Sequence, residues 1–105
     1  MYMVVRKYKI KGNKQEISSE INKGFIPLIS KIKGFVDYYC SFPDDHSFVS
    51  VSVFQDAKGA NESVSAAAEF VAKNLSKYFS GKPEILSGAV LAQGHAGLGE
   101  KRKTA

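Results

Sequence analysis

The first residues of the chain alternate in the way that a β-strand requires. In 2–10 (YMVVRKYKI), one face of the strand would carry Tyr2, Val4, Arg6, Tyr8 and Ile10. Segment 48–54 (FVSVSVF) alternates in the same way, with valines on one face and serines and phenylalanines on the other. Segment 35–42 (FVDYYCSF) is rich in aromatic and β-branched residues, which is typical of a strand covered on both sides. A turn over 43–46 would join segments 35–42 and 48–54 in a hairpin.

Residues 13–33 have the spacing of an amphipathic helix. Asn13, with Glu16 three residues later, resembles a capping box at its start. The apolar stripe comprises Ile17, Ile21, Phe25, Leu28, Ile29 and Ile32. Pro27 lacks the N–H that the helix needs, so we expect a bend or break between Gly24 and Pro27. Gly34 is the expected end of the helix.

A second helix is predicted after Asp56, a good N-cap residue. Its inner stripe would be Ala60, Val64, Ala67, Ala68, Val71, Leu75 and Tyr78. The alanine run 66–68 either lets this helix lie close to the sheet or leaves a hollow for a ligand. Close packing is the simpler interpretation.

The C-terminal part predicts one more strand and a tail. Gly81 and Pro83 are expected to end the second helix, and 84–92 (EILSGAVLA) to form the fourth strand. Gly88 within it suggests a bulge or a close backbone contact. The domain would then span 1–92, and the glycine-rich, basic segment 93–105 would be a flexible tail.

The predicted order βαββαβ is that of an α+β ferredoxin-like sandwich, with four antiparallel strands and both helices on one face. Every strand carries apolar residues on both sides, so the face without helices would expose an apolar patch in a monomer. Dimerisation through the sheet faces is the expected remedy.

Composition adds limits on compartment and partners. The 105 residues, with 44% hydrophobic and 24% charged, are typical of one globular domain. Cys40 is the only cysteine, which excludes an intramolecular disulfide, and neither a secretory signal nor a transmembrane run is evident, so we expect a cytoplasmic protein. The net charge of +5 suits solubility. RNA binding is disfavoured because the predicted third strand lacks an RNP1 signature.

Three stretches carry a family resemblance: YMVVRKYKI, GFIPLISKIKGFVDYY and VSVSVFQDAKGANES. Together they resemble the antibiotic biosynthesis monooxygenase-like domains of the dimeric α+β barrel superfamily, over residues 2 to about 92. The resemblance implies a homodimer, a pocket between helices and sheet, and cofactor-free oxygenation of a small quinol or polyketide-like aromatic. A non-catalytic small-molecule-binding or dimeric interaction domain of the same fold is the alternative.

The chain also departs from that family. Its active members commonly use a tryptophan near the end of the third strand and a histidine on the second helix. This chain has no tryptophan, Phe54 occupies the strand end, and the predicted second helix carries no histidine. These departures argue against haem degradation.

Arg6 and Asp37 are the candidate catalytic residues. Arg6 would lie among apolar side chains and stabilise a phenolate or carboxylate, or else form a structural ion pair with Asp37. Asp37, flanked by apolar residues, would act as a base with a raised pKa, or pair with Arg6.

Substrate-binding candidates are Tyr8, Tyr39, Ser52, Phe54 and Asn61. For the tyrosines, the alternative is a place in the core or the dimer interface. For Asn61 and its neighbour Ser63, the alternative is simple exposure at a helix start. No metal site is expected: Asp44, Asp45 and His46 are contiguous in a turn and would point in different directions.

Overall fold

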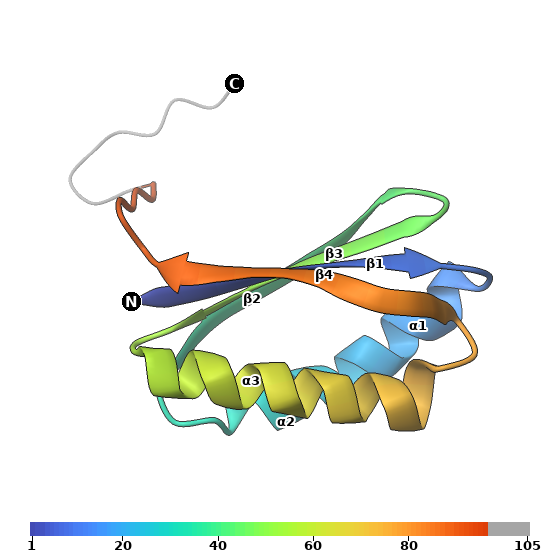
Figure 1. Ribbon diagram of the computed structural model, residues 1–105, viewed down its shortest axis with the longest axis horizontal. Coiled ribbons are helices and arrows are strands. Elements are labelled where there is room, and N and C mark those ends of the chain that lie inside the picture. Colours follow the sequence, from blue (N-terminus) through green and yellow to red (C-terminus); the bar gives the residue numbers. More distant parts are fainter. Residues whose placement is uncertain (97–105) are drawn as a thin grey trace.

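A computed structural model describes residues 1–96, and residues 97–105 lie outside the described part. The elements are β1 (Tyr2–Ile10), α1 (Lys14–Glu20), a π-helical turn η1 (Ile21–Phe25), α2 (Ile26–Ser30), β2 (Phe35–Asp44), β3 (Ser47–Phe54), α3 (Ala57–Phe70), a second π-helical turn η2 (Val71–Leu75) and β4 (Phe79–Ala89) (Figure 1). This is the predicted βαββαβ order; a π-turn interrupts the first helical segment, between α1 and α2, and a second π-turn ends the helical segment that begins with α3.

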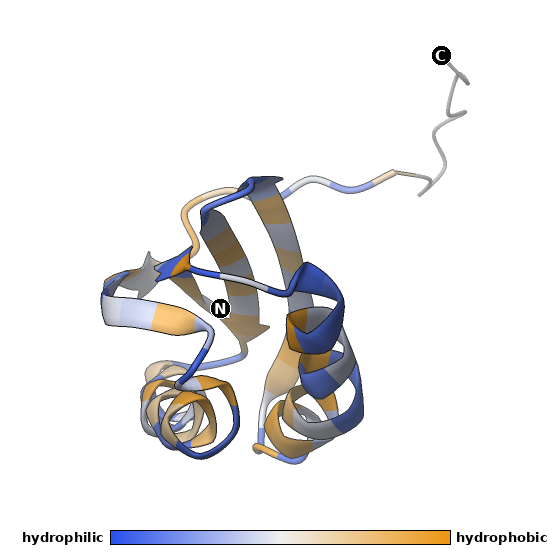
Figure 2. Cartoon of the chain, turned by 90° about the vertical axis from the view of Figure 1, so that its right-hand side faces the viewer, coloured by the Kyte–Doolittle hydropathy of each residue, from blue (hydrophilic) through white to orange (hydrophobic). Residues whose placement is uncertain are grey.

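The four strands form one antiparallel sheet in the order β2-β3-β1-β4. Both helical segments lie beneath the same face of the sheet, side by side (Figures 1 and 2). The predicted ferredoxin-like α+β fold is therefore confirmed. At the centre of the sheet, Arg6 of β1 lies opposite Ser50 of β3 and Ile85 of β4.

The hydrophobic core fills the space between helices and sheet. Its buried members are Val4, Tyr8, Ile10, Ile17, Ile21, Phe25, Ile29, Phe48, Phe54, Ala60, Ala67, Phe70, Leu75 and Phe79. Aromatic pairs join the layers: the ring centroids of Phe25 and Phe70 lie 5.4 Å apart. The opposite face of the sheet, which we call the bare face, has no helix, and its Tyr39 and Leu86 are 66% and 63% exposed.

The break in the first helix falls where the sequence predicts it. The π-turn η1 contains Gly24 and ends two residues before Pro27, so the wider turn accommodates the missing proline N–H. A Cβ added to Gly24 would lie 2.8 Å from the Phe70 ring, so glycine also permits close packing of the two helical segments. Regular helix stops at Ser30, and Gly34 turns the chain into β2 with φ +88°.

Both predicted helix caps are present. The Asn13 side chain accepts a hydrogen bond from the Glu16 N–H at 3.1 Å, and the Asp56 carboxylate accepts one from the Gly59 N–H at 3.0 Å. Each cap satisfies a backbone donor that has no partner within its helix.

The boundaries predicted for the fourth strand are wrong. β4 begins at Phe79 and ends at Ala89, so Gly81 and Pro83 lie inside it. The register of β1 against β4 shifts between Lys7 and Lys9, opposite the segment that holds these two residues. A bulge on an edge strand tolerates a proline and a positive φ, here +73° at Gly81. Gly88, in contrast, pairs regularly with Met3, and nothing lies within 4 Å of its missing side chain.

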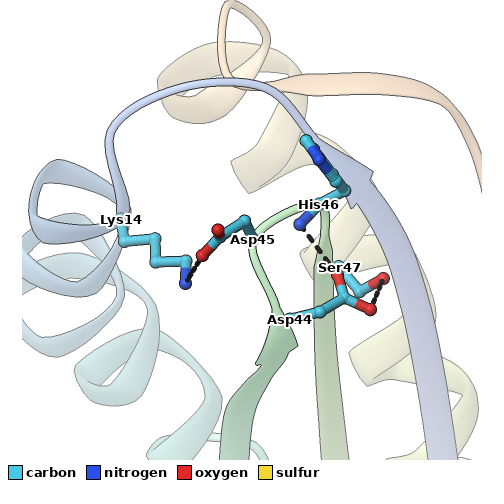
Figure 3. A network of polar contacts seen from close by, with 5 residues as sticks. All are labelled: Lys14, Asp44, Asp45, His46 and Ser47. Atoms are coloured by element: carbon cyan, nitrogen blue, oxygen red, sulfur yellow. Dashed lines mark hydrogen bonds and ion pairs between the residues drawn. The ribbon is translucent and has the colours of Figure 1, made fainter.

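The turn predicted over 43–46 is shorter in the structure, because β2 runs to Asp44. The polar side chains at this turn form hydrogen bonds with neighbouring residues (Figure 3). Lys14 donates to the Asp45 carboxylate at 2.7 Å. Asp44 accepts from the His46 N–H at 2.8 Å and from the Ser47 hydroxyl at 3.3 Å. The two carboxylates therefore have separate partners and stabilise the turn against the start of α1. Among residues 1–96, no helix is long and apolar enough to cross a membrane.

The contact between α3 and the sheet gives a stability prediction. In Gly59→Ala, the new Cβ would lie 2.9 Å from the Lys33 carbonyl oxygen and 3.0 Å from the Phe54 ring. We expect a loss of about 1–3 kcal/mol in the free energy of unfolding, despite the better helix propensity of alanine. Urea denaturation measures it, with Gly88→Ala as the control. Equal stability of the two variants would contradict close packing at Gly59.

Candidate functional site

Arg6 is the central polar residue of the helix-facing sheet surface. It lies in the middle of β1, and the strand alternation that points Val4 and Tyr8 toward the helices points Arg6 there too. Only 1% of Arg6 is exposed, which makes it one of the most deeply buried large side chains among residues 1–96. Such burial of a guanidinium requires partners.

Two serine hydroxyls partner the guanidinium. Nη1 donates to Ser52 Oγ on β3 at 3.1 Å, and Nη2 donates to Ser63 Oγ on α3 at 2.8 Å. Ser63 donates in turn to the Ala60 carbonyl at 2.7 Å, which fixes its orientation. The Nε–H of Arg6 is buried and has no hydrogen-bond partner within the described part of the chain.

Of the two alternatives for Arg6, the structural ion pair with Asp37 is wrong. Asp37 pairs with Val53 across the strands and is exposed; it lines a hollow on the bare face with Met3 and Tyr39. A register shift between Phe35 and Asp37 inserts Val36, and the carboxylate then falls on the side of the sheet away from Arg6. The ion pairs within residues 1–96 are Lys14–Asp45 and Lys73–Glu69, and neither includes Arg6.

The electrostatics of this site are those of one buried cation among neutral groups. Burial lowers the pKa of the Arg6 guanidinium, and the nearby Tyr8 and Tyr38 raise it in part. Burial also raises the pKa of both Tyr8 and Tyr38, so these phenols are neutral at neutral pH. Arginine keeps its proton even when buried. The positive charge is therefore not balanced by an ionised group of the described chain.

A cavity of about 200 Å³ lies between α3, η2 and β4, with Arg6 in its wall. The lining residues are Arg6, Tyr8, Val64, Ala67, Ala68, Val71, Ala72, Pro83 and Ile85. A second void of about 10 Å³, the size of one water molecule, shares Arg6 and Tyr8 and is also lined by Tyr38 and Ser50. Close packing of the alanine-rich helix is thus wrong, and the alternative of a hollow is the one observed.

The predicted substrate-binding residues fall in three environments. Tyr8 lines both cavities, and Ser52 is buried against Arg6. Phe54 is fully buried, but its ring packs on Phe35 at 5.8 Å, outside the lining of either cavity. Tyr39 is exposed on the bare face, and Asn61 is exposed on α3. The structure brings together Arg6, Tyr8 and Ser52 and separates the other predicted residues from them.

Ser63 is the main residue that the sequence-based reasoning missed. It was expected to be exposed, but none of it is accessible to solvent. The signal is its spacing, three residues after Ala60 and four before Ala67, which places it on the buried stripe of α3. Tyr38 and Ser50 complete the polar lining and belong to the helix-facing side of their strands.

The serine contacts predict unequal effects of two neighbouring substitutions on α3. Ser63→Ala removes the partner of a buried, charged N–H, so we expect the free energy of unfolding to fall by about 1–3 kcal/mol. Ser65→Ala, at an exposed position of the same helix, should change it by no more than about 0.5 kcal/mol. Thermal and urea denaturation measure both. Equal effects would mean that the hydrogen bond to Arg6 does not stabilise the fold.

Comparison with known proteins gives structural relatives only. No protein-family model matches the chain, and no curated protein matches it in sequence. Among solved structures, the protein of unknown function NE2512 from Nitrosomonas europaea has a TM-score of 0.71 at 17% identity, covering 91% of this chain and 94% of that one.

Two structures with an assigned activity are also similar. The cofactor-independent oxygenase SnoaB from Streptomyces nogalater has a TM-score of 0.71 at 16% identity, over 88% of this chain and 94% of that one. The monooxygenase ActVA-Orf6 of Streptomyces coelicolor, in complex with nanaomycin D, has a TM-score of 0.64 at 17% identity, over 88% and 92%. The chain therefore has the fold of antibiotic biosynthesis monooxygenase-type structures.

Proposed function

We propose that this protein is a cofactor-independent monooxygenase that acts on a small electron-rich aromatic, quinol-like or polyketide-like, in the cavity between α3 and the sheet. The observation that carries the proposal is the buried, charge-unbalanced Arg6 in the wall of an otherwise apolar cavity. A cation in a dry site stabilises a developing oxyanion far more than the same cation in water. The structural similarity to a cofactor-independent oxygenase supports this assignment.

The proposed chemistry asks little of the protein beyond binding and charge stabilisation. A phenol or enol that has lost its proton is electron-rich enough to reduce dioxygen itself. One oxygen atom then enters the ring, and the other leaves as water with two hydrogens from the substrate. Arg6 would hold the anion, and the apolar side chains of the walls, such as Ala67 and Val71, would pack against the ring. No cofactor has a part in this scheme.

We also propose that two copies associate through their bare faces. Tyr39 and Leu86 are largely exposed there, and Val36 and Met3 lie on the same face. Apolar surface of this kind is stabilised when a partner covers it. The single cysteine, which excludes an intramolecular disulfide, supports the cytoplasm as the compartment.

A non-catalytic domain that binds a small molecule is the second candidate. It is favoured by one observation: neither cavity lining contains a histidine or a carboxylate that could take a proton from a substrate. Turnover distinguishes the two functions.

Oxygen uptake with a panel of quinols and anthrones tests the proposal. We expect turnover by the wild type, and a fall in kcat/KM of about 10²-fold or more in Arg6→Met, because the stabilisation of the anion is lost. The control is Lys58→Met, which removes an exposed cation from α3 and should leave kcat/KM unchanged. Absence of turnover across the panel would leave the binding function in its place.

Sedimentation velocity tests the proposed dimer. The wild type should sediment as a dimer at micromolar concentration, and Leu86→Lys as a monomer, because a charge on the bare face opposes burial. Leu28→Lys, at an exposed apolar position on α2, should leave the dimer intact. A monomeric wild type, or a dimer that survives Leu86→Lys, would contradict association through this face.

A further inference from the structure

We propose that the cavity takes a ligand that is already an anion when it binds, a small aromatic acid or acidic phenol, and that the guanidinium of Arg6 donates to its charged oxygen. This inference deepens the proposed function and, as a statement about catalysis, rests on it. As a statement about binding, it can be tested without turnover.

The first reason is charge. The guanidinium is 1% exposed and lies among groups that are all uncharged at neutral pH. Its two direct partners, Ser52 and Ser63, are neutral hydroxyls. An isolated buried charge is costly, and a bound anion would offset that cost directly. A neutral ligand of the same shape would displace water from the cavity and leave the charge as unbalanced as before.

The second reason is the absence of a proton acceptor. Across both cavity linings, the polar side chains are Arg6, Tyr8, Tyr38 and Ser50. None of these accepts a proton at neutral pH: the guanidinium is protonated, the serine is a hydroxyl, and burial keeps both phenols un-ionised. The carboxylate at Asp37 lies on the other face of the sheet. A ligand that binds as an anion must therefore lose its proton to bulk water, either in solution or at the mouth of the cavity.

The third reason is the pattern of occupied and free donors. Ser52 and Ser63 hold Nη1 and Nη2 from two different elements, which fixes the guanidinium plane. A guanidinium carries five N–H donors, so Nε–H and the second N–H of both Nη1 and Nη2 have no partner among residues 1–96. These N–H groups can donate to a charged oxygen, and a charge-assisted hydrogen bond of this type is about twice as strong as a neutral one.

The size and lining of the cavity indicate what the uncharged part of the ligand is. Its walls are alanine, valine, proline and isoleucine side chains from α3, η2 and β4. Its volume of about 200 Å³ exceeds the roughly 150 Å³ of an apolar cavity known to bind benzene. One aromatic ring or two fused rings with a single acidic group would fit this space.

Isothermal titration calorimetry on the full chain tests the inference with two shape-matched pairs, benzoate with benzamide and 2-naphthoate with 2-naphthamide. We expect one of the acids to bind about ten-fold or more tightly than its amide at pH 7. The preference should persist between pH 6 and 9, because no lining side chain changes its charge in that range. Equal affinity, or no saturable binding by either acid, would overturn the inference.

Arg6→Met and Lys58→Met assign the preference to a residue. In Arg6→Met, the acid and the amide should bind equally, and the rise in melting temperature that the acid induces in the wild type should disappear. Lys58→Met, which removes one charge from an exposed position, should keep the wild-type preference. A preference that survives in Arg6→Met would overturn the inference.

A second readout separates loss of the anion site from loss of the fold. Arg6→Met replaces a buried, unbalanced charge with a shorter apolar side chain, so the ligand-free variant should still fold and melt in one cooperative transition. Arg6→Lys tests the charge on its own and should retain a preference for the acid. Acid-selective binding without oxygen uptake would refute the monooxygenase proposal alone. Oxygen uptake with equal binding of acid and amide would refute the inference alone.

Discussion

The site between α3 and the sheet depends on a buried guanidinium that is held by hydroxyls and not by a carboxylate. Arg6 ties the centre of the sheet to α3 through Ser52 and Ser63, one hydrogen bond to each layer. Hydroxyl partners satisfy the geometry of two N–H groups but leave the charge unbalanced. A carboxylate in their place would balance the charge of Arg6 within the protein. With serines as its partners, the positive charge of Arg6 has no counter-charge in the site, and in our proposal an anionic ligand supplies it.

The helix above the guanidinium accounts for the cavity. Small side chains on α3 and η2, among them Ala67, Ala68 and Ala72, do not fill the space between the helix and β4. Elsewhere the same helix packs closely, because Gly59 lets it approach Phe54 and the Lys33 carbonyl. The start of α3 therefore packs closely against the sheet, whereas the small residues in its second half leave the hollow open.

The chemistry of the site follows from these two features together. The cavity walls are largely apolar, and a single cation among them makes a negative oxygen more stable there than in a neutral cavity. Neither lining supplies a base, so the acidity of the ligand itself decides whether it binds as an anion. In the proposed function, one interaction would both recognise the substrate and stabilise its reactive anion.

The sequence by itself determined the order of elements, the caps at Asn13 and Asp56, the break before Pro27 and the face on which Arg6 and Tyr8 lie, because periodicity and local hydrogen bonds decide these features. Tertiary structure decided the rest. A two-residue bulge opposite Lys7 and Lys9 accommodates Gly81 and Pro83 within β4, and a one-residue shift in β2 turns Asp37 away from Arg6. Register depends on strands distant in the chain, so local spacing did not predict which groups meet the guanidinium.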